Sequence, residues 1–544
     1  MKLVFNIFLA LFISNYLPAQ QMENPVVPDE VGLFYPANMQ AQQFTNPVIP
    51  GDFADPTVIR FAGKYYATGT SSEWAPHYPL FESTDLINWN YIGPAFKTKP
   101  EWTKSSFWAP ELFVLNGKIF LYYTARRASD GVSYIGVAST DNIKEGFQDH
   151  GCLVAFEKEA IDAFIFEDNG KLYISWKAYG LDKRPIELLC SELSPDGLRL
   201  VGEPFTLLRD DEGKGMEGQY MFKKGDYYYI IYSILGCCGP RSNYAVSVAR
   251  STSFKGPYEK FEGNPILQGD GEAIQACGHG TAVETPEGKM YYLFHAYMKG
   301  KGFYNGRQAF LKELAISDDN WPYFVTSRYA SITEPMPAGQ VVSASTSTGQ
   351  SIQNTVSDFE DLFDGVEIKP QWTWNYTYAT AAPTVKNNML YLSGTAFEEN
   401  NYGTALCLRT LKPDYEITTA IKDQPGLFSG LTLYGDKDNL LLFGKENGSI
   451  YLKQIRRGVE QILYQSTHQG SIHLKIIIDD GCFASFQWSA DQKNWNPLPA
   501  ANQKLDVSYL PPWDRVFRPG LIHIGNENSP AEYAYCRLLY NRSQ

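Results

Sequence analysis

Three acidic residues and one histidine recur at one place in a repeated pattern of this sequence. Counting back eight residues from the glycines at 63, 117, 170 and 225 reaches Asp55, Ala109, Asp162 and Glu217, and counting back nine from Gly288 reaches His279. Equivalent positions of such a repeat lie in a ring about its axis, so three carboxylates and one imidazole should converge. Clustered like charges are costly and are kept where chemistry uses them, for example as a general acid and a general base. Single acidic residues often start strands as turn residues, but three at one offset favour a catalytic set.

The elements that position these residues are β-hairpins. Each unit has an apolar run, a Gly-containing turn such as Asn116-Gly117-Lys118, and a second run rich in Tyr, which is the pattern of a hairpin. The turn glycines lie 54, 53, 55 and 63 residues apart, and a period of this size indicates a propeller with one sheet per repeat. A Ser-containing turn, such as Ser83-Thr84-Asp85, follows each hairpin between two further strands. The sequence therefore predicts five four-stranded blades over residues 45–335.

The motifs around these positions resemble those of glycoside hydrolase family 43 in order and spacing. They are Gly51-Asp52-Phe53-Ala54-Asp55-Pro56, Phe107-Trp108-Ala109-Pro110-Glu111, Ile161-Asp162, Met216-Glu217-Gly218, Gly278-His279-Gly280 and Gly306-Arg307-Gln308. The resemblance implies an inverting glycosidase on a five-bladed β-propeller that acts on arabinose- and xylose-containing polysaccharides. Two departures stand beside the expected residues: Ala163-Phe164 replaces the commoner Pro-Ser, and Gln219 replaces the commoner Pro.

The resemblance also assigns roles to the three carboxylates. Inverting hydrolysis needs one carboxylic acid to protonate the leaving oxygen and one carboxylate, roughly 6.5–9.5 Å away, to activate water. By resemblance, Asp55 is the general base and Glu217 the general acid. Asp162 is the third carboxylate, which keeps Glu217 protonated by like-charge repulsion and orients it. Opposed positions around a propeller axis would supply the required gap.

Four further residues are implied to bind the substrate: Phe53, Trp108, His279 and Arg307. Trp108 is expected to form an apolar wall, and Arg307 to donate hydrogen bonds to sugar hydroxyls or to the acid. In relatives the histidine that matches His279 lies near a structural Ca²⁺, reached through water; the alternative is a buried histidine bonded to its neighbours. The sequence has no dedicated oxygen-ligand loop of the kind that calcium usually uses, and no cofactor is expected for the chemistry itself.

After the propeller the period is lost. Residues 336–356 contain a Ser/Thr-rich stretch and are predicted to be a linker. Residues 357–544 show about ten short alternating strands, which predicts a β-sandwich. The opening from Phe359 to Trp374 resembles the concanavalin-like sandwich that often follows this propeller. Trp372 and Trp374 could stack on sugar, but packing is the favoured expectation.

The charge, the N-terminal segment and the cysteines of the chain indicate which partners and which cellular compartment to expect. Its 544 residues carry 47 basic and 60 acidic side chains, a formal charge of −13, without a basic cluster, which argues against nucleic acid and anionic membrane surfaces. Residues 1–19 read as a signal peptide, followed by an extended lead-in over 20–44, so the protein is expected to be exported, either periplasmic or secreted. The eight cysteines include Cys237-Cys238, which could be a disulfide or two buried thiols.

These observations favour an exo-acting enzyme that removes terminal α-L-arabinofuranosyl or β-D-xylosyl groups from plant polysaccharides or oligosaccharides. The alternatives are an endo-arabinanase with an open groove and a sugar-binding propeller without turnover. The intact set of three carboxylates argues against a mere binder. The Arg-Asp-Pro and Glu-Cys-Pro motifs of the five-bladed fructan hydrolases do not occur.

Overall fold

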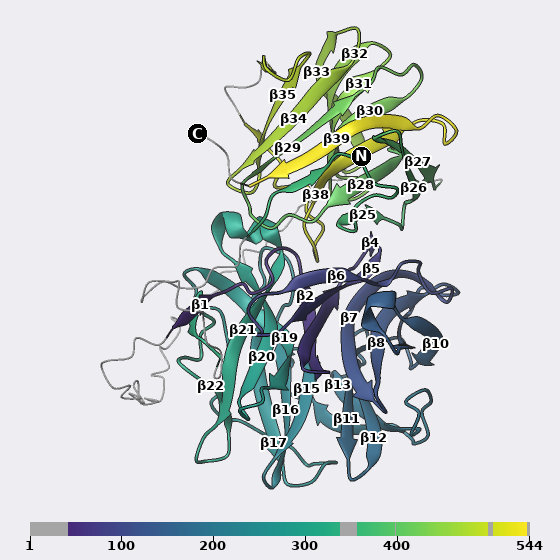
Figure 1. Ribbon diagram of the computed structural model, residues 1–544. Coiled ribbons are helices and arrows are strands. Elements are labelled where there is room, and N and C mark those ends of the chain that lie inside the picture. Colours follow the sequence, from purple (N-terminus) through teal and green to yellow (C-terminus); the bar gives the residue numbers. More distant parts are fainter. Residues whose placement is uncertain (1–41, 338–355, 398, 499–503, 541–544) are drawn as a thin grey trace, which may run out of the picture. The chain divides into compact units, whose positions relative to one another are not determined.

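Strands make up almost all of the regular structure, together with two short 3-10 helices at Ile143–Glu145 and Gly300–Asn305 (Figure 1). The computed structural model describes residues 42–337, 356–397, 399–498 and 504–540, which all belong to one compact unit. The predicted signal peptide, most of the predicted lead-in and most of the predicted linker lie outside the described residues. Within the described part of the chain, no helix is long and apolar enough to span a membrane.

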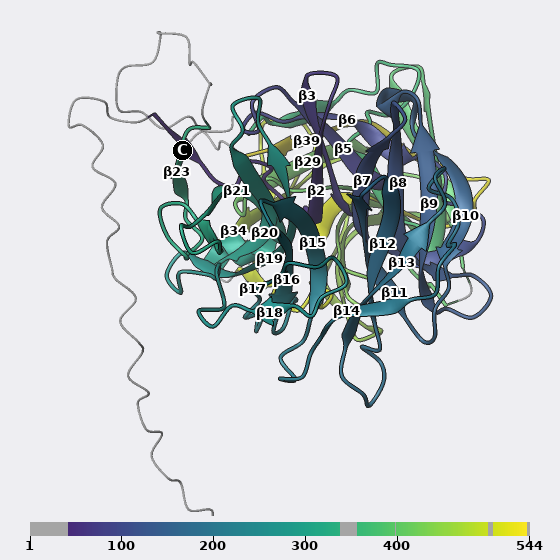
Figure 2. The ribbon, with the colours of Figure 1, turned by 90° about the horizontal axis from the view of Figure 1, so that it is seen from below.

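Five antiparallel sheets of four strands form the propeller, as the repeat predicts (Figure 2). The blades are β2 (Ala54–Phe61), β3 (Lys64–Thr70), β5 (His77–Ser83) and β6 (Asn90–Phe96); β7 (Thr103–Leu115), β8 (Lys118–Arg127), β9 (Ser133–Thr140) and β10 (Gln148–Val154); β11 (Ala160–Asp168), β12 (Lys171–Ala178), β13 (Glu187–Leu193) and β14 (Phe205–Arg209); β15 (Glu217–Lys224), β16 (Tyr227–Ile234), β17 (Ala245–Ser251) and β18 (Glu259–Lys260); and β19 (Ile274–Glu284), β20 (Met290–Met298), β21 (Arg307–Ile316) and β22 (Pro322–Phe324). Strand β1 (Gln43–Thr45) pairs with β23 (Thr333–Pro335), which joins the two ends of the propeller segment.

The turns of the inner hairpins explain why these sequences fold as they do. Asn116 and Gly117 have φ values of 51° and 79°, and Asn169 and Gly170 have 49° and 76°. Positive φ at both central positions is what a tight hairpin with the natural strand twist requires, and Asn-Gly adopts it at least cost. In the fourth blade the turn is Gly225-Asp226, so the glycine occupies the first turn position and not the second.

Each innermost strand carries a β-bulge at one equivalent place. The pairing register breaks there in all five blades. The bulged residues have positive φ: Asp55 49°, Ala109 38°, Asp162 59°, Gly218 60° and His279 40°. The ring of equivalent positions therefore contains Gly218, and Glu217 stands one residue before it. The count from the turn glycines was wrong by one here, because the turn of the fourth blade places its glycine one position earlier.

The sandwich, the fold class predicted for residues 357–544, consists of two sheets whose order follows from strand pairing. Its strands, more than the ten expected, are β24 (Phe359–Asp361), β25 (Trp372–Asn375), β26 (Ala379–Lys386), β27 (Met389–Ala396), β28 (Thr404–Leu408), β29 (Tyr415–Ile421), β30 (Phe428–Tyr434), β31 (Leu440–Glu446), β32 (Ser449–Arg456), β33 (Val459–Thr467), β34 (Ile472–Asp479), β35 (Phe483–Ser489), β36 (Asn496–Pro497), β37 (Leu505–Asp506), β38 (Arg518–Ile524) and β39 (Ala531–Leu539). Alternate side chains of both sheets fill a core between them, for example Leu431, Ile476 and Leu538.

The sandwich is joined to the first blade by strand pairing. β4 (Trp74–Ala75), in the loop between β3 and β5, pairs with β25, with Trp374 opposite Ala75. Trp372 is buried in the sandwich core, where its Nε1 donates to Asp361 Oδ2 at 2.9 Å. Trp374 packs against apolar clusters of both domains. The packing expected for the two tryptophans is therefore what the structure shows.

Candidate active site

The bulges bring the expected side chains together at one mouth of the propeller. His279 Nδ1 lies 3.5 Å from Asp55 Oδ1 and 3.9 Å from Asp162 Oδ2. The backbone N–H of Gly218, next to Glu217, donates to Asp162 Oδ2 at 3.0 Å. The fifth ring position is the buried, apolar Ala109. Four of the five blades thus contribute a charged or titratable group to one small region.

A second set of residues, which lies outside the sequence motifs, holds this ring. The residues paired with the last position before each bulge are Thr70, Thr124, Lys177, Ser233 and His295. Four of these side chains accept a hydrogen bond from the bulged N–H of the next blade: Thr70 from Ala109 (2.8 Å), Thr124 from Asp162 (3.1 Å), Ser233 from His279 (2.7 Å) and His295 from Asp55 (3.0 Å). We call this set of five the latch positions. Their signal in the sequence is a polar residue at the end of each Tyr-rich strand.

Asp55 is held as an ionised carboxylate. Thr70 Oγ1 donates to its Oδ2 at 2.6 Å, and Arg307 Nη1 lies 3.1 and 3.3 Å from its two oxygens. Burial raises the pKa of Asp55, but the neighbouring positive charge, above all that of the Arg307 guanidinium, holds this pKa well below its usual value. Burial also lowers the pKa of His295 to about 4, which keeps this imidazole neutral at neutral pH.

Glu217 is a part-buried carboxylate whose two oxygens both accept hydrogen bonds. Tyr244 Oη donates to Oε1 at 2.9 Å, and Lys177 Nζ donates to Oε2 at 2.8 Å. Burial raises the pKa of Glu217, but the neighbouring Lys177 ammonium outweighs it and lowers the pKa below its usual value. Neither lysine nor tyrosine was expected at this carboxylate.

The pKa of Asp162 is shifted in the opposite direction to that of Glu217. It is buried, and its pKa rises to about 6 because burial, partly offset by His279, combines with the negative charge of Glu217. Of the two neighbouring carboxylates, Asp162 therefore binds a proton more readily in this structure, whereas the expected general acid was Glu217. The physical reason is the position of Lys177, which lies against Glu217.

Arg307 connects the expected base to the sandwich. Its Nη1 contacts Asp55, and its Nη2 donates to the backbone oxygen of Asp514 at 3.1 Å. Its charge contact is with Asp55, not with the expected acid. Asp514 lies between β37 and β38 of the sandwich, and its Oδ2 accepts a hydrogen bond from Ser72 at 3.3 Å. A loop of the second domain thus reaches the rim of the site.

The same loop lies near the paired cysteines. Cys237 and Cys238 form a disulfide, which decides between the two alternatives. A Cβ placed on Gly239 would lie 3.2 Å from the backbone oxygen of Trp513, so the cysteine loop and the sandwich loop approach closely. The Trp513 side chain is 63% exposed.

The two aromatic residues expected to bind substrate differ in position. Trp108 is half-buried, with the Arg126 guanidinium 5.6 Å from its ring centroid, so it has surface to offer a ligand. Phe53 has 0% exposed surface and packs edge-on against Phe81. The expectation that Phe53 contacts substrate is therefore wrong for this structure, because its ring fills the core beneath the site.

The side chains around His279 leave little free oxygen for the possible calcium ion. The two carboxylate oxygens nearest to its ring already accept hydrogen bonds, from Arg307 and from the N–H of Gly218. Among the described residues, no group of three or more His, Cys, Asp or Glu has the arrangement of a metal site. These side chains do not fit a directly bound Ca²⁺, which needs six to eight oxygen ligands. The water-mediated ion stays a prediction.

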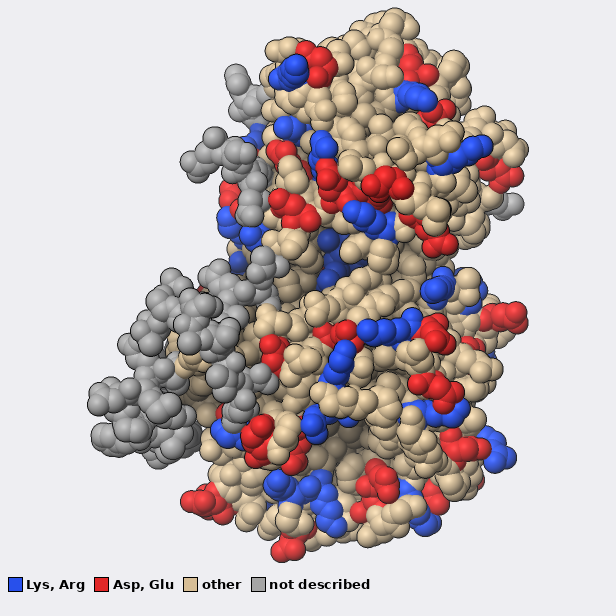
Figure 3. All heavy atoms as spheres, viewed as in Figure 1, with Lys and Arg blue, Asp and Glu red and all other residues tan. Residues whose placement is uncertain are grey.

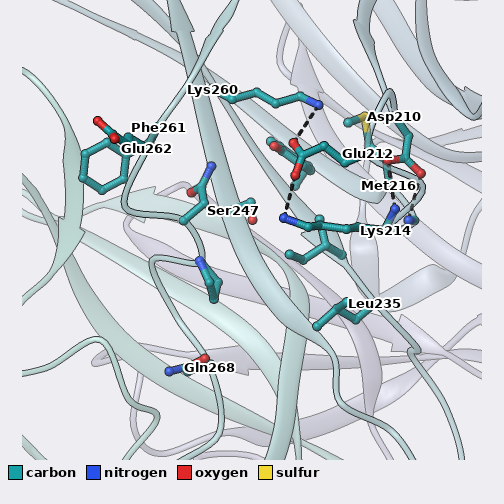
Figure 4. Close-up of a pocket in the computed structure, with 15 residues that line it drawn as sticks. Asp210, Glu212, Lys214, Met216, Leu235, Ser247, Lys260, Phe261, Glu262 and Gln268 are labelled. Atoms are coloured by element: carbon teal, nitrogen blue, oxygen red, sulfur yellow. Dashed lines mark hydrogen bonds and ion pairs between the residues drawn. The ribbon is translucent and has the colours of Figure 1, made fainter. Parts of the chain in front are cut away.

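A separate hollow lies beside the site. A pocket of about 450 Å³ is lined by Met216, the neighbour of Glu217, and by residues such as Leu235, Ser247, Phe261 and Gln268 (Figure 4). Lys214 and Lys260 both pair with Glu212 at its edge. None of the three expected catalytic carboxylates lines it. The carboxylates that the sequence predicts to be catalytic therefore lie at the axial mouth and not in this pocket.

We predict that Gly218→Ala destabilises the protein more than Gly225→Ala does. Both glycines have φ near +60°, so each alanine meets similar backbone strain, on the order of 1–2 kcal/mol. A Cβ at 218 would also lie 2.6 Å from His279 Cγ, whereas nothing lies within 4 Å at 225. Urea unfolding of both variants measures the difference. Equal losses of stability would show that the His279 ring moves aside freely.

Comparison with known proteins agrees with this architecture. A family model described as "Glycosyl hydrolases family 43" matches residues 44–322, and one described as "Beta xylosidase C-terminal Concanavalin A-like domain" matches residues 360–513. A beta-xylosidase of Bacillus subtilis (strain 168) is 26% identical over 423 residues, which are 71% of this chain and 76% of that protein. An extracellular exo-alpha-(1->5)-L-arabinofuranosidase of Cellvibrio japonicus is 27% identical over 303 residues, which are 50% of this chain and 84% of that protein.

A solved structure extends the likeness over both domains. The crystal structure of a family 43 protein from Bacillus licheniformis superposes with a TM-score of 0.75 and covers 92% of this chain and 100% of its own. Its sequence is 21% identical, so this match concerns the fold.

Proposed function

The chain belongs to glycosyl hydrolase family 43 and is a glycosidase, and on that premise we propose that it releases terminal β-D-xylosyl or α-L-arabinofuranosyl residues with inversion. Its substrates would be plant cell-wall polysaccharides and their oligosaccharides. Two relatives support this choice, because one is named a beta-xylosidase and the other an exo-acting arabinofuranosidase.

The observation that carries the proposal is the different environment of the carboxylates. Asp55 is held ionised by Arg307, while burial and the charge of Glu217 raise the pKa of Asp162 to about 6. The neighbouring pair Asp162 and Glu217 thus keeps a proton to higher pH than Asp55 does, so the site can hold a proton beside an ionised base. Asp55 removes a proton from the attacking water, with Thr70 and Arg307 fixing its oxygens. Glu217 protonates the leaving oxygen, and Asp162 orients it through the N–H of Gly218.

Exo action is supported by the sandwich loop at the rim. Asp514 touches both Ser72 and Arg307. A wall on that side of the mouth favours a pocket that admits a chain end over a groove open at both sides. The measurement is the product pattern from linear arabinan and xylo-oligosaccharides labelled at the reducing end, with anomeric configuration read by NMR. Internal cleavage products or retained configuration would contradict the proposal.

We also propose that the enzyme works outside the cytoplasm. The Cellvibrio japonicus relative is named extracellular. The Cys237–Cys238 disulfide suits an oxidising compartment. Charged side chains of both signs are interspersed on the face shown in Figure 3, and such a surface suits uncharged polysaccharides.

We predict that Asp55→Asn and Glu217→Gln each lower kcat/KM on natural substrates by about 10²–10⁴-fold, the usual contribution of a positioned acid or base. They should differ on aryl glycosides with good leaving groups, which depart without protonation. Glu217→Gln should recover much of its rate there, whereas Asp55→Asn should not, because water still needs activation. The measurement is kcat/KM across leaving groups of graded pKa. Rescue of Asp55→Asn alone would show that the two roles are reversed.

We predict a pH profile whose acidic limb lies below the ordinary carboxylate range. Asp55 must be ionised to act as a base, and its pKa is held well below the usual value, so activity should persist as the pH falls. Arg307→Met removes the cation that holds this pKa down, so the acidic limb should move to higher pH. The profile of kcat/KM against pH measures this. An unmoved limb would assign the acidic limb to another group.

A further inference from the structure

Lys177 is the exception among the five latch positions. Thr70, Thr124, Ser233 and His295 each accept the bulged N–H of the following blade. In the third blade the position holds a lysine, which has no acceptor atom. The N–H that it would receive, that of Gly218, goes to Asp162 Oδ2. Lys177 therefore does not accept the bulged N–H of the next blade, and its ammonium instead donates to Glu217.

The Lys177 ammonium opposes the role proposed for Glu217, which is to protonate the leaving oxygen. A general acid must present an O–H to the leaving oxygen, but both oxygens of Glu217 already accept hydrogen bonds. The Tyr244 hydroxyl can rotate and become an acceptor, whereas an ammonium is only a donor. With Tyr244 turned, Oε1 can carry the proton, but the ammonium at Oε2 favours the ionised carboxylate, so Glu217 takes up a proton more readily once Lys177 moves away.

The carboxyl group of Glu159 lies close enough to Lys177 to be its alternative partner. Glu159, just before β11, has its Oε1 4.0 Å from Lys177 Nζ. This oxygen is buried and accepts no hydrogen bond from a side chain of the described residues; burial raises the pKa of the Glu159 carboxyl, while Lys177 and the backbone N–H of Gly180 lower it. Gly180 leaves the room that the lysine needs, because a Cβ there would lie 2.9 Å from Lys177 Cε and 2.4 Å from Glu159 Oε1. The Lys177 ammonium therefore lies between Glu217, whose Oε2 it contacts at 2.8 Å, and Glu159, whose Oε1 is 4.0 Å away.

We propose that Lys177 is a positioning residue that exchanges its ammonium between Glu217 and Glu159, and that its move to Glu159 frees Glu217 to carry and donate the proton of the reaction. The inference rests on the proposed function. The lysine keeps its three protons throughout. Glu217 takes its proton from solvent and gives it to the leaving oxygen, while the proton that Asp55 removes from water returns to solvent.

The other titratable groups around Glu217 cannot take the place of the Lys177 ammonium. They are Asp162 on β11, Tyr244 before β17, His279 on β19 and Asp55 on β2. Arg307, the other buried cation at the mouth, is bound to Asp55. Lys177 is therefore the cation whose position decides whether Glu217 is paired.

The experiment compares Glu159→Gln and Lys177→Met with wild type, each assayed with an unactivated disaccharide and a nitrophenyl glycoside. Lys171→Met is the matched control, because Lys171 is on the same strand but exposed and paired with Glu192. In Glu159→Gln the lysine loses its alternative partner, so disaccharide kcat/KM should fall about 10–100-fold while nitrophenyl turnover changes little. The alkaline limb of the pH profile should move to lower pH. In Lys177→Met that limb should move to higher pH by about one unit, because the cation no longer favours ionised Glu217.

The outcomes separate the inference from the proposed function. If wild type turns over no xyloside or arabinofuranoside, the proposed function fails. If wild type is active but Glu159→Gln keeps the wild-type ratio of the two substrates and an unmoved alkaline limb, the lysine exchange is overturned. Equal losses on both substrates without a limb shift also overturn it, since a purely structural role predicts that pattern. Should Lys177→Met fail to fold, Glu159→Gln alone gives the decision, and Lys171→Met should behave as wild type.

Discussion

The site depends on one backbone constraint: a bulged N–H in each innermost strand that cannot join its own sheet. A buried N–H without an acceptor costs about as much as a lost hydrogen bond, so each bulge needs a partner from elsewhere. In four blades the preceding neighbour in the ring supplies it, through Thr70, Thr124, Ser233 or His295. In the fourth blade Asp162, itself a bulged residue, supplies it for Gly218. The bond that closes each blade onto the next therefore also holds the bulged residues, among them the proposed catalytic residues Asp55 and Asp162.

This arrangement divides two cations among three carboxylates. Arg307 is bound to Asp55, and Lys177 is bound to Glu217, while the Asp162 carboxylate lies beside His279, accepts a backbone N–H and feels Lys177 at longer range. The pKa values of Asp55 and Glu217 are lowered because each has a bound cation, and the pKa of Asp162 is raised because it has none bound to it. An arginine suits the base, because it is always charged and holds both oxygens. A lysine on a flexible stem suits a partner that has to be released.

Much of this could be predicted from the sequence, because the repeat is local. The Asn-Gly turns and the spacing of the glycines indicate the hairpins, and with them the five blades and the positions of Asp55, Asp162 and His279. The ring position of Glu217 was missed by one residue, because the glycine of a turn can occupy either of its central positions. Phe53 was misjudged because a motif does not show which side of the strand faces the core. Lys177 stands at a polar latch position, but that position does not show which carboxylate it contacts. Tyr244 and Asp514 lie far along the chain from Glu217 and Arg307, and no local pattern marks these contacts.

The sandwich also contributes to the catalytic unit through a chain of contacts. The backbone oxygen of Asp514 holds one nitrogen of Arg307, and another nitrogen of the same guanidinium holds Asp55. Arg307 Nε has no partner among the described residues, so these two contacts fix the plane of the group. Without the sandwich loop the buried guanidinium would lose a neutral acceptor and could turn away from the base. The strand pairing of β25 with β4 holds the loop's domain against the first blade, which carries Asp55. Residues of both domains therefore hold Asp55, the proposed base, in place.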